Sequence, residues 1–221
     1  MNKQHRALFI CGGWAGHSPV ETADLFMPIL EERGFDVTLE HSLETYADVD
    51  FLKTFSVIVQ SWTMGDILAE ELRGLTQAVI SGTGFAGWHG GIVDSFRIAT
   101  DYLNMTGGQF VAHPHGIREY QVTPVPSQAD HPIMRGIEPF TVVSEQYWTL
   151  TDSLNTVLAT TTIPKLPGDP WAAPIEVPVA WVRTWGAGRL FVNTIGHGTG
   201  DLSVEPVQEM MLRGIEWAAH S

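Results

Sequence analysis

Five of the nine histidines lie in turns that glycine or proline flank: His17 in AGHSP, His89 in GWHGG, His113 and His115 in AHPHG, and His197 in IGHGTGD. Imidazole suits such turns because it transfers protons near neutral pH and binds divalent transition metals. His89 and His197 each follow a short apolar run that we expect to be a strand, so the two rings are predicted to meet at one sheet edge. We therefore predict that they act as an acid–base pair or hold a metal.

The metal interpretation extends to two further turn histidines. His17 and His113, with His89 and His197, are the candidate ligands for Zn²⁺ or Mn²⁺. Their spacing matches no strong zinc motif such as HExxH. The alternative is that a turn histidine bonds to nearby backbone, which we favour for His17, His113 and His115 taken singly. Whether a metal is bound is left open by the sequence.

Glu145 lies inside an apolar and aromatic run, VVSEQYW. A carboxylate there is either half-exposed on an edge strand or held in a pocket that tunes its proton affinity. In the pocket interpretation, His89, His197 and Glu145 form the predicted catalytic set. Asp201, in GHGTGD, either orients His197 or caps the helix that follows.

Aromatic side chains near the same strand ends are candidates for stacking on sugar rings. The alternative is an aromatic core, which is the commoner reason for tryptophan. The predicted substrate-binding residues, aromatic and histidine together, are Trp14, His17, Trp62, Trp88, His113 and Tyr147.

Cys11 is the single cysteine, so no internal disulfide is expected. It ends the first apolar run and is interpreted as a small buried residue rather than a nucleophile. The neighbouring GGWAG lacks both the GxGxxG spacing and the lysine of a phosphate-binding loop.

The first half of the chain, which must position several of these residues, alternates between strand-like and helix-like patterns. This alternation is typical of a parallel sheet covered by helices. Pro19 suits a first helical turn and Gly34 a helix stop, and we expect Asp94 to cap or begin the helix after His89. The expected strands are 7–13, 35–41, 55–61 and 84–88, and the expected helices are 19–34, 69–82 and 93–108.

The region from about 111 to 178 is rich in proline and poor in helical patterns. Strands, some of them antiparallel, are expected to extend the main sheet, and the proline-rich loop 163–178 is expected to contribute to a pocket rim. A hairpin near the end of the sheet and a C-terminal helix follow. These strands are 120–125, 140–150 and 155–162, the hairpin is 177–198, and the helix is 204–219.

Composition limits the function classes. The 221 residues are 44% hydrophobic and 17% charged, which predicts one globular domain spanning 1–221. The 12 basic and 25 acidic residues give a net charge of −13, which disfavours nucleic acid and membrane surfaces as partners. No signal peptide or apolar span is evident, so we expect a cytoplasmic protein with a small-molecule partner. Whether it forms a homo-oligomer is left open.

The chain resembles the ThuA-like (trehalose utilisation) family over nearly its full length. The segments that carry the resemblance are GFAGWHGG, GGQFVAHP, ADHPIMRGIEPFTVVSEQYW and PVAWVRTWGAGRLFVNTIGHG. The resemblance implies a flavodoxin-like α/β three-layer sandwich with a mainly parallel central sheet, of the class I glutamine amidotransferase type, with an extra β-rich segment in the middle. It places His89 at the position of that superfamily's nucleophilic cysteine and His197 near its catalytic histidine.

An imidazole at the elbow leaves no thiol for glutamine hydrolysis through a thioester. The resemblance instead implies carbohydrate metabolism, with a disaccharide or keto-sugar as substrate and a divalent metal as cofactor. We expect isomerase, lyase or hydrolase chemistry that uses His89, His197 and Glu145. The alternative is a non-catalytic sugar-binding or regulatory module on the same fold. Gly91 and Ile92 replace a histidine that family members often place after the elbow, so the sugar's identity stays open.

Overall fold

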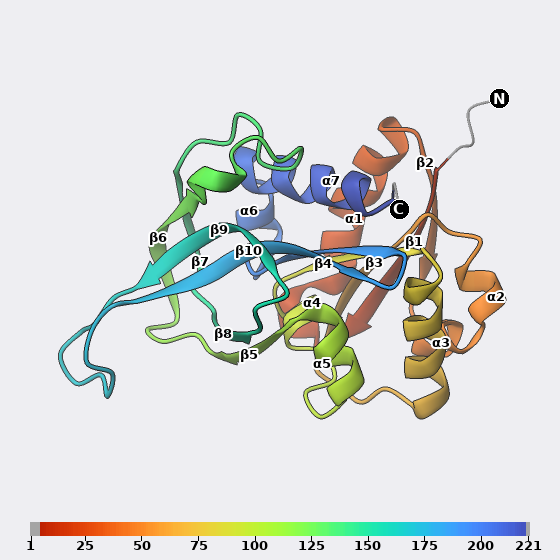
Figure 1. Cartoon of the computed structure of the whole chain (residues 1–221), viewed down its shortest axis with the longest axis horizontal. Coiled ribbons are helices and arrows are strands. Elements are labelled where there is room, and N and C mark those ends of the chain that lie inside the picture. The colour runs from red at the N-terminus through yellow and green to blue at the C-terminus, as the bar shows by residue number, and fades with distance from the viewer. Residues whose placement is uncertain (1–4, 220–221) are drawn as a thin grey trace.

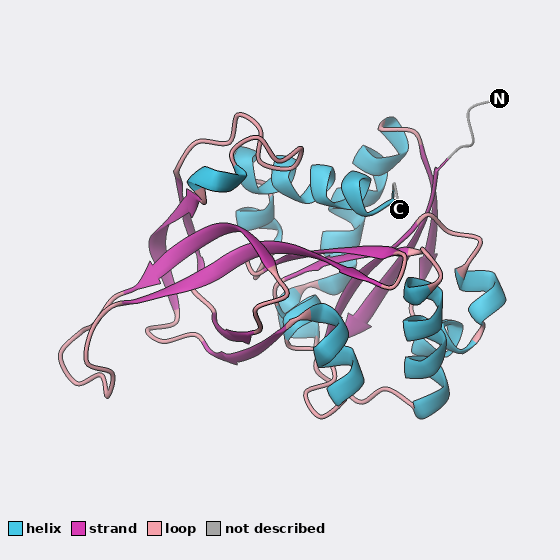
Figure 2. Ribbon diagram, viewed as in Figure 1, coloured by secondary structure: helices cyan, strands magenta, loops and turns pink. Residues whose placement is uncertain are grey.

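The computed structural model describes residues 5–219, which form a mixed α/β fold around one nine-stranded sheet (Figures 1 and 2). The strand order is β2-β1-β3-β4-β11-β10-β9-β6-β7, and β5 pairs with β8 in a separate sheet. The strands are β1 (His5–Gly13), β2 (Phe35–Glu40), β3 (Val57–Thr63), β4 (Gly84–Trp88), β5 (Gly108–Ala112), β6 (Ile117–Pro124), β7 (Phe140–Glu145), β8 (Trp148–Thr151), β9 (Thr156–Ile163), β10 (Ile175–Trp185) and β11 (Gly188–Asn193).

Helices cover both faces of the sheet, as the alternating sequence pattern predicted (Figure 1). In β1, Ala7 and Phe9 pack on the face covered by α1 and α7, whereas Leu8 and Ile10 pack on the face covered by α3, α4 and α5. The helices are α1 (Pro19–Glu32), α2 (Val49–Leu52), α3 (Ala69–Ile80), α4 (Gly90–Val93), α5 (Thr100–Thr106), α6 (Thr199–Leu202) and α7 (Glu205–Ala219), with 3-10 turns η1 (Ala15–His17), η2 (Leu43–Ala47) and η3 (Pro126–Gln128).

The strands β2, β1, β3, β4 and β11 run parallel, so their carboxyl ends share one edge. The predicted hairpin of β10 and β11 is present, but its expected place near the end of the sheet is wrong. β11 pairs in parallel with β4, so the hairpin lies in the middle of the strand order. Local sequence indicates the turn between two strands but not which third strand they pair with. Because β11 pairs with β4, the carboxyl ends of these two strands lie side by side.

Beyond β10 the sheet continues with antiparallel strands, as expected for the proline-rich middle. The run 140–150, expected as one strand, is divided: β7 ends at Glu145 and pairs with β6, while β8 begins at Trp148 and pairs with β5. The chain therefore changes sheets at Gln146 and Tyr147. This change places Glu145 at the end of a strand, where its side chain can turn toward the parallel strand ends.

The segment after β4 does not form the single helix expected over 93–108. A short helix, α4, ends at Val93, and α5 begins only at Thr100. Asp94 follows the end of α4 instead of capping the start of a helix, and both of its carboxylate oxygens accept hydrogen bonds from Arg97. Residues Gly108–Ala112 form β5, which the helical interpretation missed. Among residues 5–219, no helix combines the length and apolar character that a bilayer span requires.

A buried glutamine fixes the helix α4 to the sheet. Gln60, at the centre of β3, donates through Nε2 toward the Gly91 carbonyl at 2.9 Å, and Ser95 Oγ and Tyr102 Oη lie at 3.1 and 2.7 Å from the same atom. Its Oε1 accepts a hydrogen bond of 2.8 Å from Tyr46. Because buried polar groups are costly when unpaired, this network holds the turn that follows β4 in one position.

Replacing Gln60 with leucine is expected to lower the free energy of unfolding by about 3 kcal/mol, because it orphans the buried Tyr46 hydroxyl and removes a donor from Gly91. Urea denaturation monitored by tryptophan fluorescence measures the change. The matched control is Gln77→Leu on the exposed face of α3, which should change stability by less than about 0.5 kcal/mol. Equal effects at the two positions would contradict the structural role of the network.

Candidate metal centre

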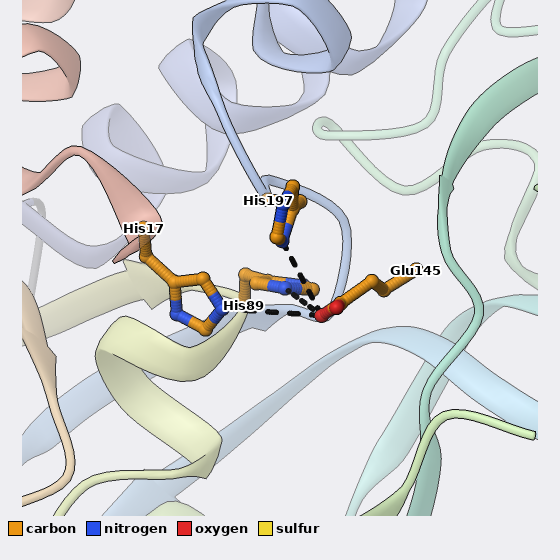
Figure 3. A group of neighbouring side chains, drawn as sticks. All are labelled: His17, His89, Glu145 and His197. Atoms are coloured by element: carbon orange, nitrogen blue, oxygen red, sulfur yellow. Dashed lines mark hydrogen bonds and ion pairs between the residues drawn. The ribbon is translucent and has the colours of Figure 1, made fainter. Parts of the chain in front are cut away.

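Four side chains from distant parts of the sequence converge at the shared strand edge (Figure 3). His17 ends the turn after β1, His89 follows β4, His197 lies in the loop after β11, and Glu145 ends β7. One ligand atom from each of the four lies within 4.8 Å of the others. The structure thus brings together the three predicted catalytic residues, His89, His197 and Glu145, with His17, so that three of the four predicted metal ligands lie in the cluster.

The three imidazoles all face the same carboxylate oxygen. Glu145 Oε2 lies 3.2 Å from His89 Nε2, 3.3 Å from His197 Nδ1 and 3.9 Å from His17 Nε2. Ligands about 2.0–2.1 Å from a zinc ion in a tetrahedron are about 3.3 Å from one another. Two of the separations from Glu145 Oε2 match that value, and no two of the four ligand atoms are more than 4.8 Å apart, so contraction by an ångström or so would place all four around one ion.

Each histidine has two ring nitrogen atoms, and the hydrogen bonds of one indicate whether the other is available to bind a metal ion. His89 Nδ1 lies 2.8 Å from the Thr194 carbonyl oxygen, which can only accept, so this nitrogen carries a proton. His17 Nδ1 lies 3.0 Å from Thr63 Oγ1. His197 Nδ1 is buried and has no hydrogen-bond partner among the described residues. If the His89 ring is neutral, its Nε2 carries a lone pair that faces the negatively charged Glu145 carboxylate. A cation between these two groups would stabilise the arrangement.

Electrostatics keep two of these groups in the protonation states that bind metals. Burial lowers the pKa of His17 to about 3, with a further contribution from His89 and His197. Burial alone would raise the pKa of Glu145, but the hydrogen bond with His89 and the nearby histidine charges lower it to about 2. At neutral pH the site therefore presents an uncharged imidazole at His17 and a carboxylate at Glu145, as metal coordination requires.

The turn that carries His89 is strained and closely packed. His89 has φ +49° and ψ −140°, a conformation uncommon outside glycine, and its backbone N–H donates to the Asn193 carbonyl at 2.7 Å. The next residue, Gly90, has no side chain because a Cβ there would lie 2.5 Å from His17 Nδ1. The geometry is that of a sharp strand-to-helix elbow that directs a side chain out of the sheet edge.

An aromatic wall supports the cluster. The Tyr147 ring stacks on His89 with 3.9 Å between centroids and contacts Phe110 at 4.4 Å. Tyr147 is buried, so its role is to hold the imidazole rather than to present a free face. Sequence reasoning missed Phe110, because it lies on β5, which was not among the expected strands. The nearby exposed aromatic ring is Trp14, 4.8 Å from His17.

The remaining predicted site residues differ in how close they come. His113 Nε2 lies 3.7 Å from Glu145 Oε1, and the His113 side chain is 42% exposed. Trp62 is half-buried and lies over Gly12. The substrate-binding prediction for Trp88 is wrong: its side chain points into the core and packs against Phe9 and Phe26, because alternation along β4 directs it to the α1 face.

Asp201 fulfils both of the roles considered for it. Its carboxylate accepts hydrogen bonds of 2.9 Å from the backbone N–H groups of His197 and Gly198, at the start of α6. Ser144 donates a further hydrogen bond to it from β7. The residue therefore caps α6 and fixes the backbone from which His197 projects. In the proline-rich loop, Trp171 packs against His115 and Trp148.

Cys11 is buried in the core, as expected. Burial, with a smaller effect of Asp24, raises the pKa of its thiol to about 11. The reactive thiolate is therefore scarce below that pH. We expect iodoacetamide at pH 8 to modify Cys11 more than about 100-fold more slowly in the native protein than in urea, as measured by mass spectrometry. Equal rates in the two states would show that the thiol is accessible and reactive.

Comparisons with known proteins give a consistent result. The family model described as ThuA, trehalose utilisation, matches residues 6–218. A ThuA-like protein from Parabacteroides merdae ATCC 43184 superposes with a TM-score of 0.78 at 18% identity, covering 98% of this chain and 90% of the other. A ThuA-like protein from Bacteroides uniformis ATCC 8492 gives 0.77 at 16% identity, covering 97% and 91%. A cytoplasmic protein from Salmonella typhimurium LT2 gives 0.65 at 15% identity, covering 97% and 98%. No curated protein matches the chain.

Proposed function

We propose, from the premise that this chain belongs to the ThuA (trehalose utilisation) family, that it is a sugar-modifying enzyme whose cluster holds one divalent metal ion. The observation that carries this proposal is the convergence of three imidazoles and one carboxylate, whose ligand atoms lie within 4.8 Å of one another, with His197 Nδ1 buried 3.3 Å from Glu145 Oε2 and without a hydrogen bond among the described residues. Zinc and manganese are the ions that such a donor set suits. We also propose the flavodoxin-like, amidotransferase-type form of the fold and a cytoplasmic location.

His17, His89, His197 and Glu145 would hold the ion. It would supply a positive charge that polarises a carbonyl or hydroxyl oxygen of a sugar. Thr194 and Thr63 keep the His89 and His17 rings oriented through their second nitrogens, as the outer partners of metal-binding histidines do. A keto-sugar suits this arrangement, because a carbonyl group acidifies the neighbouring C–H bond and a modest base then suffices to remove the proton.

The proton acceptor in this scheme is His113. Glu145, with a pKa of about 2, is too weak a base for efficient proton transfer near neutral pH. His89 is fully buried, its Nδ1 bonds to the Thr194 carbonyl and its Nε2 would hold the ion, which leaves no nitrogen for proton transfer. His113 has an exposed side chain, and its Nε2 lies 3.7 Å from Glu145 Oε1, so its ring is open to solvent beside the cluster. Glutamine hydrolysis is not proposed, because the elbow carries an imidazole and the thiol of Cys11 lies in the core.

Metal analysis of the purified protein tests the central proposal. We expect one equivalent of zinc or manganese per chain after loading and dialysis, and loss of that equivalent in the double variant His89→Ala/His197→Ala. Unfolding by urea checks that the variant is folded. A wild-type protein that retains no metal, or a double variant that retains it, would overturn the proposal. Metal and sugar binding without turnover of any keto-sugar would favour a binding module.

His113→Ala separates holding the metal from moving protons. Because His113 lies outside the four-residue cluster, the variant is expected to keep its full equivalent of metal. Removal of a general base should lower kcat by about 100-fold or more on whichever sugar the wild type converts. Steady-state assays and metal analysis of the same preparation give both values. Loss of the metal, or an unchanged kcat, would contradict the assignment of the base.

A further inference from the structure

A groove adjoins the metal cluster on the side of His197. Its volume is about 590 Å³, and it runs between the edge strand β7 and the segment from His197 to Val204 that includes α6. His197 belongs to both sites: its Nδ1 is buried toward Glu145, while 30% of its side chain is exposed. The lining residues that bear on binding are Glu119, Thr141, Val143, His197, Gly198 and Gly200.

The chemistry of the lining favours an uncharged, hydroxyl-rich ligand. Thr141 offers a hydroxyl, and Glu119 offers an exposed carboxylate beside Val143, its partner across the β6–β7 pair. Val143 is 59% exposed, and its methyl groups can contact the C–H face of a ring. None of the lining residues is lysine or arginine, and the chain carries a net charge of −13. A phosphate or carboxylate group on the ligand would therefore be repelled.

Hydrogen bonds fix the two walls of the groove, and glycines keep it open. Ser144 on β7 donates to Asp201 on α6, and Asp201 in turn accepts from the backbone of His197 and Gly198. A Cβ built on Gly198 or Gly200 would meet no described atom within 4 Å. The space beside these glycines is therefore available to a ligand that also reaches His197.

We propose that this groove binds the second, unreactive ring of a neutral disaccharide or glycoside whose other ring lies at the metal cluster. The proposal rests on the function proposed above and assigns Glu119, Thr141 and Val143 to substrate specificity. Glu119 and Thr141 hydrogen-bond the hydroxyl groups of the second ring, and Val143 packs against its face. Phosphorylated sugars are excluded by the acidic lining.

Calorimetric titration of the zinc-loaded protein with trehalose, glucose and trehalose 6-phosphate tests the proposal. The wild type should bind trehalose about ten-fold or more tightly than either of the other two sugars. Gly200→Phe, which fills the groove, should weaken trehalose binding by about ten-fold while leaving glucose binding within about two-fold. Leu154→Phe is the control, because it places the same aromatic side chain at an exposed position outside the groove. Glu119→Lys should tighten the binding of trehalose 6-phosphate.

The outcomes separate this proposal from the one on which it depends. A wild-type protein that shows no preference for trehalose over glucose, including one that binds neither, overturns the groove proposal. So does a Gly200→Phe variant that binds trehalose normally or loses both sugars equally. Zinc content is measured before any sugar is added, and a wild type that retains no zinc overturns the proposed function instead. Unchanged zinc content in Gly200→Phe and Glu119→Lys shows that the cluster is intact.

Discussion

Replacing Glu145 with glutamine is expected to weaken zinc binding by more than about 100-fold and to abolish measurable turnover. The substitution preserves the size of the side chain and removes one negative charge. Three imidazole nitrogens face a single oxygen of that carboxylate at 3.2 to 3.9 Å. Loss of an outer partner of a metal ligand costs about 10–100-fold in affinity, so loss of a charged ligand at the centre should cost more.

Competition with a chromophoric chelator measures the zinc affinity of this variant, and steady-state assays measure its turnover. Glu176→Gln is the matched control, because Glu176 is an exposed carboxylate on β10. It should bind zinc as the wild type does. The cluster would be a hydrogen-bonded network without a metal role if Glu145→Gln bound zinc within about two-fold of the control.

Much of the α/β architecture could be predicted because it depends on local pattern. Apolar runs of strand length alternate with amphipathic segments, and Pro19 and Gly34 mark the bounds of a helix that the structure places at Pro19–Glu32. The position of the β10–β11 hairpin could not be predicted, because strand order is decided by contacts between segments far apart in sequence. The break between α4 and α5 likewise depends on contacts with the distant end of β3: the Met64 N–H donates to the Asp94 carbonyl at 3.0 Å, and Ser95 Oγ donates to the Trp62 carbonyl at 2.6 Å.

The residues at the strand ends could be predicted from the sequence to lie near one another, but the direction in which their side chains point could not. His89 and His197 were predicted to meet because parallel strands share an edge, and they do, with ring centroids 5.7 Å apart. His17, favoured as a backbone-bonded turn residue when taken singly, belongs to the cluster, and its ring packs against Gly90 at the start of α4. Trp88 precedes His89 by one residue, and strand alternation alone sends it into the core.

A single added methyl group, in Gly90→Ala, is expected to weaken zinc binding by about 10–100-fold without unfolding the protein. A Cβ at this position would lie 2.5 Å from both Cε1 and Nδ1 of His17 and 3.0 Å from Thr63 Cγ2. The imidazole must therefore move, and its contact with Thr63 Oγ1 is lost. Gly200→Ala is the control, because a Cβ there meets no described atom within 4 Å.

A double-mutant cycle tests whether Gly90→Ala weakens zinc binding by displacing His17. If Gly90→Ala acts by displacing the imidazole, adding it to His17→Ala should cost nothing further in zinc affinity, because the displaced ring is already absent. If the methyl group instead distorts the elbow, the two losses should add, since His89 would also be misplaced. Additive losses would therefore show that Gly90→Ala acts through the strained backbone of His89 and not through the His17 ring.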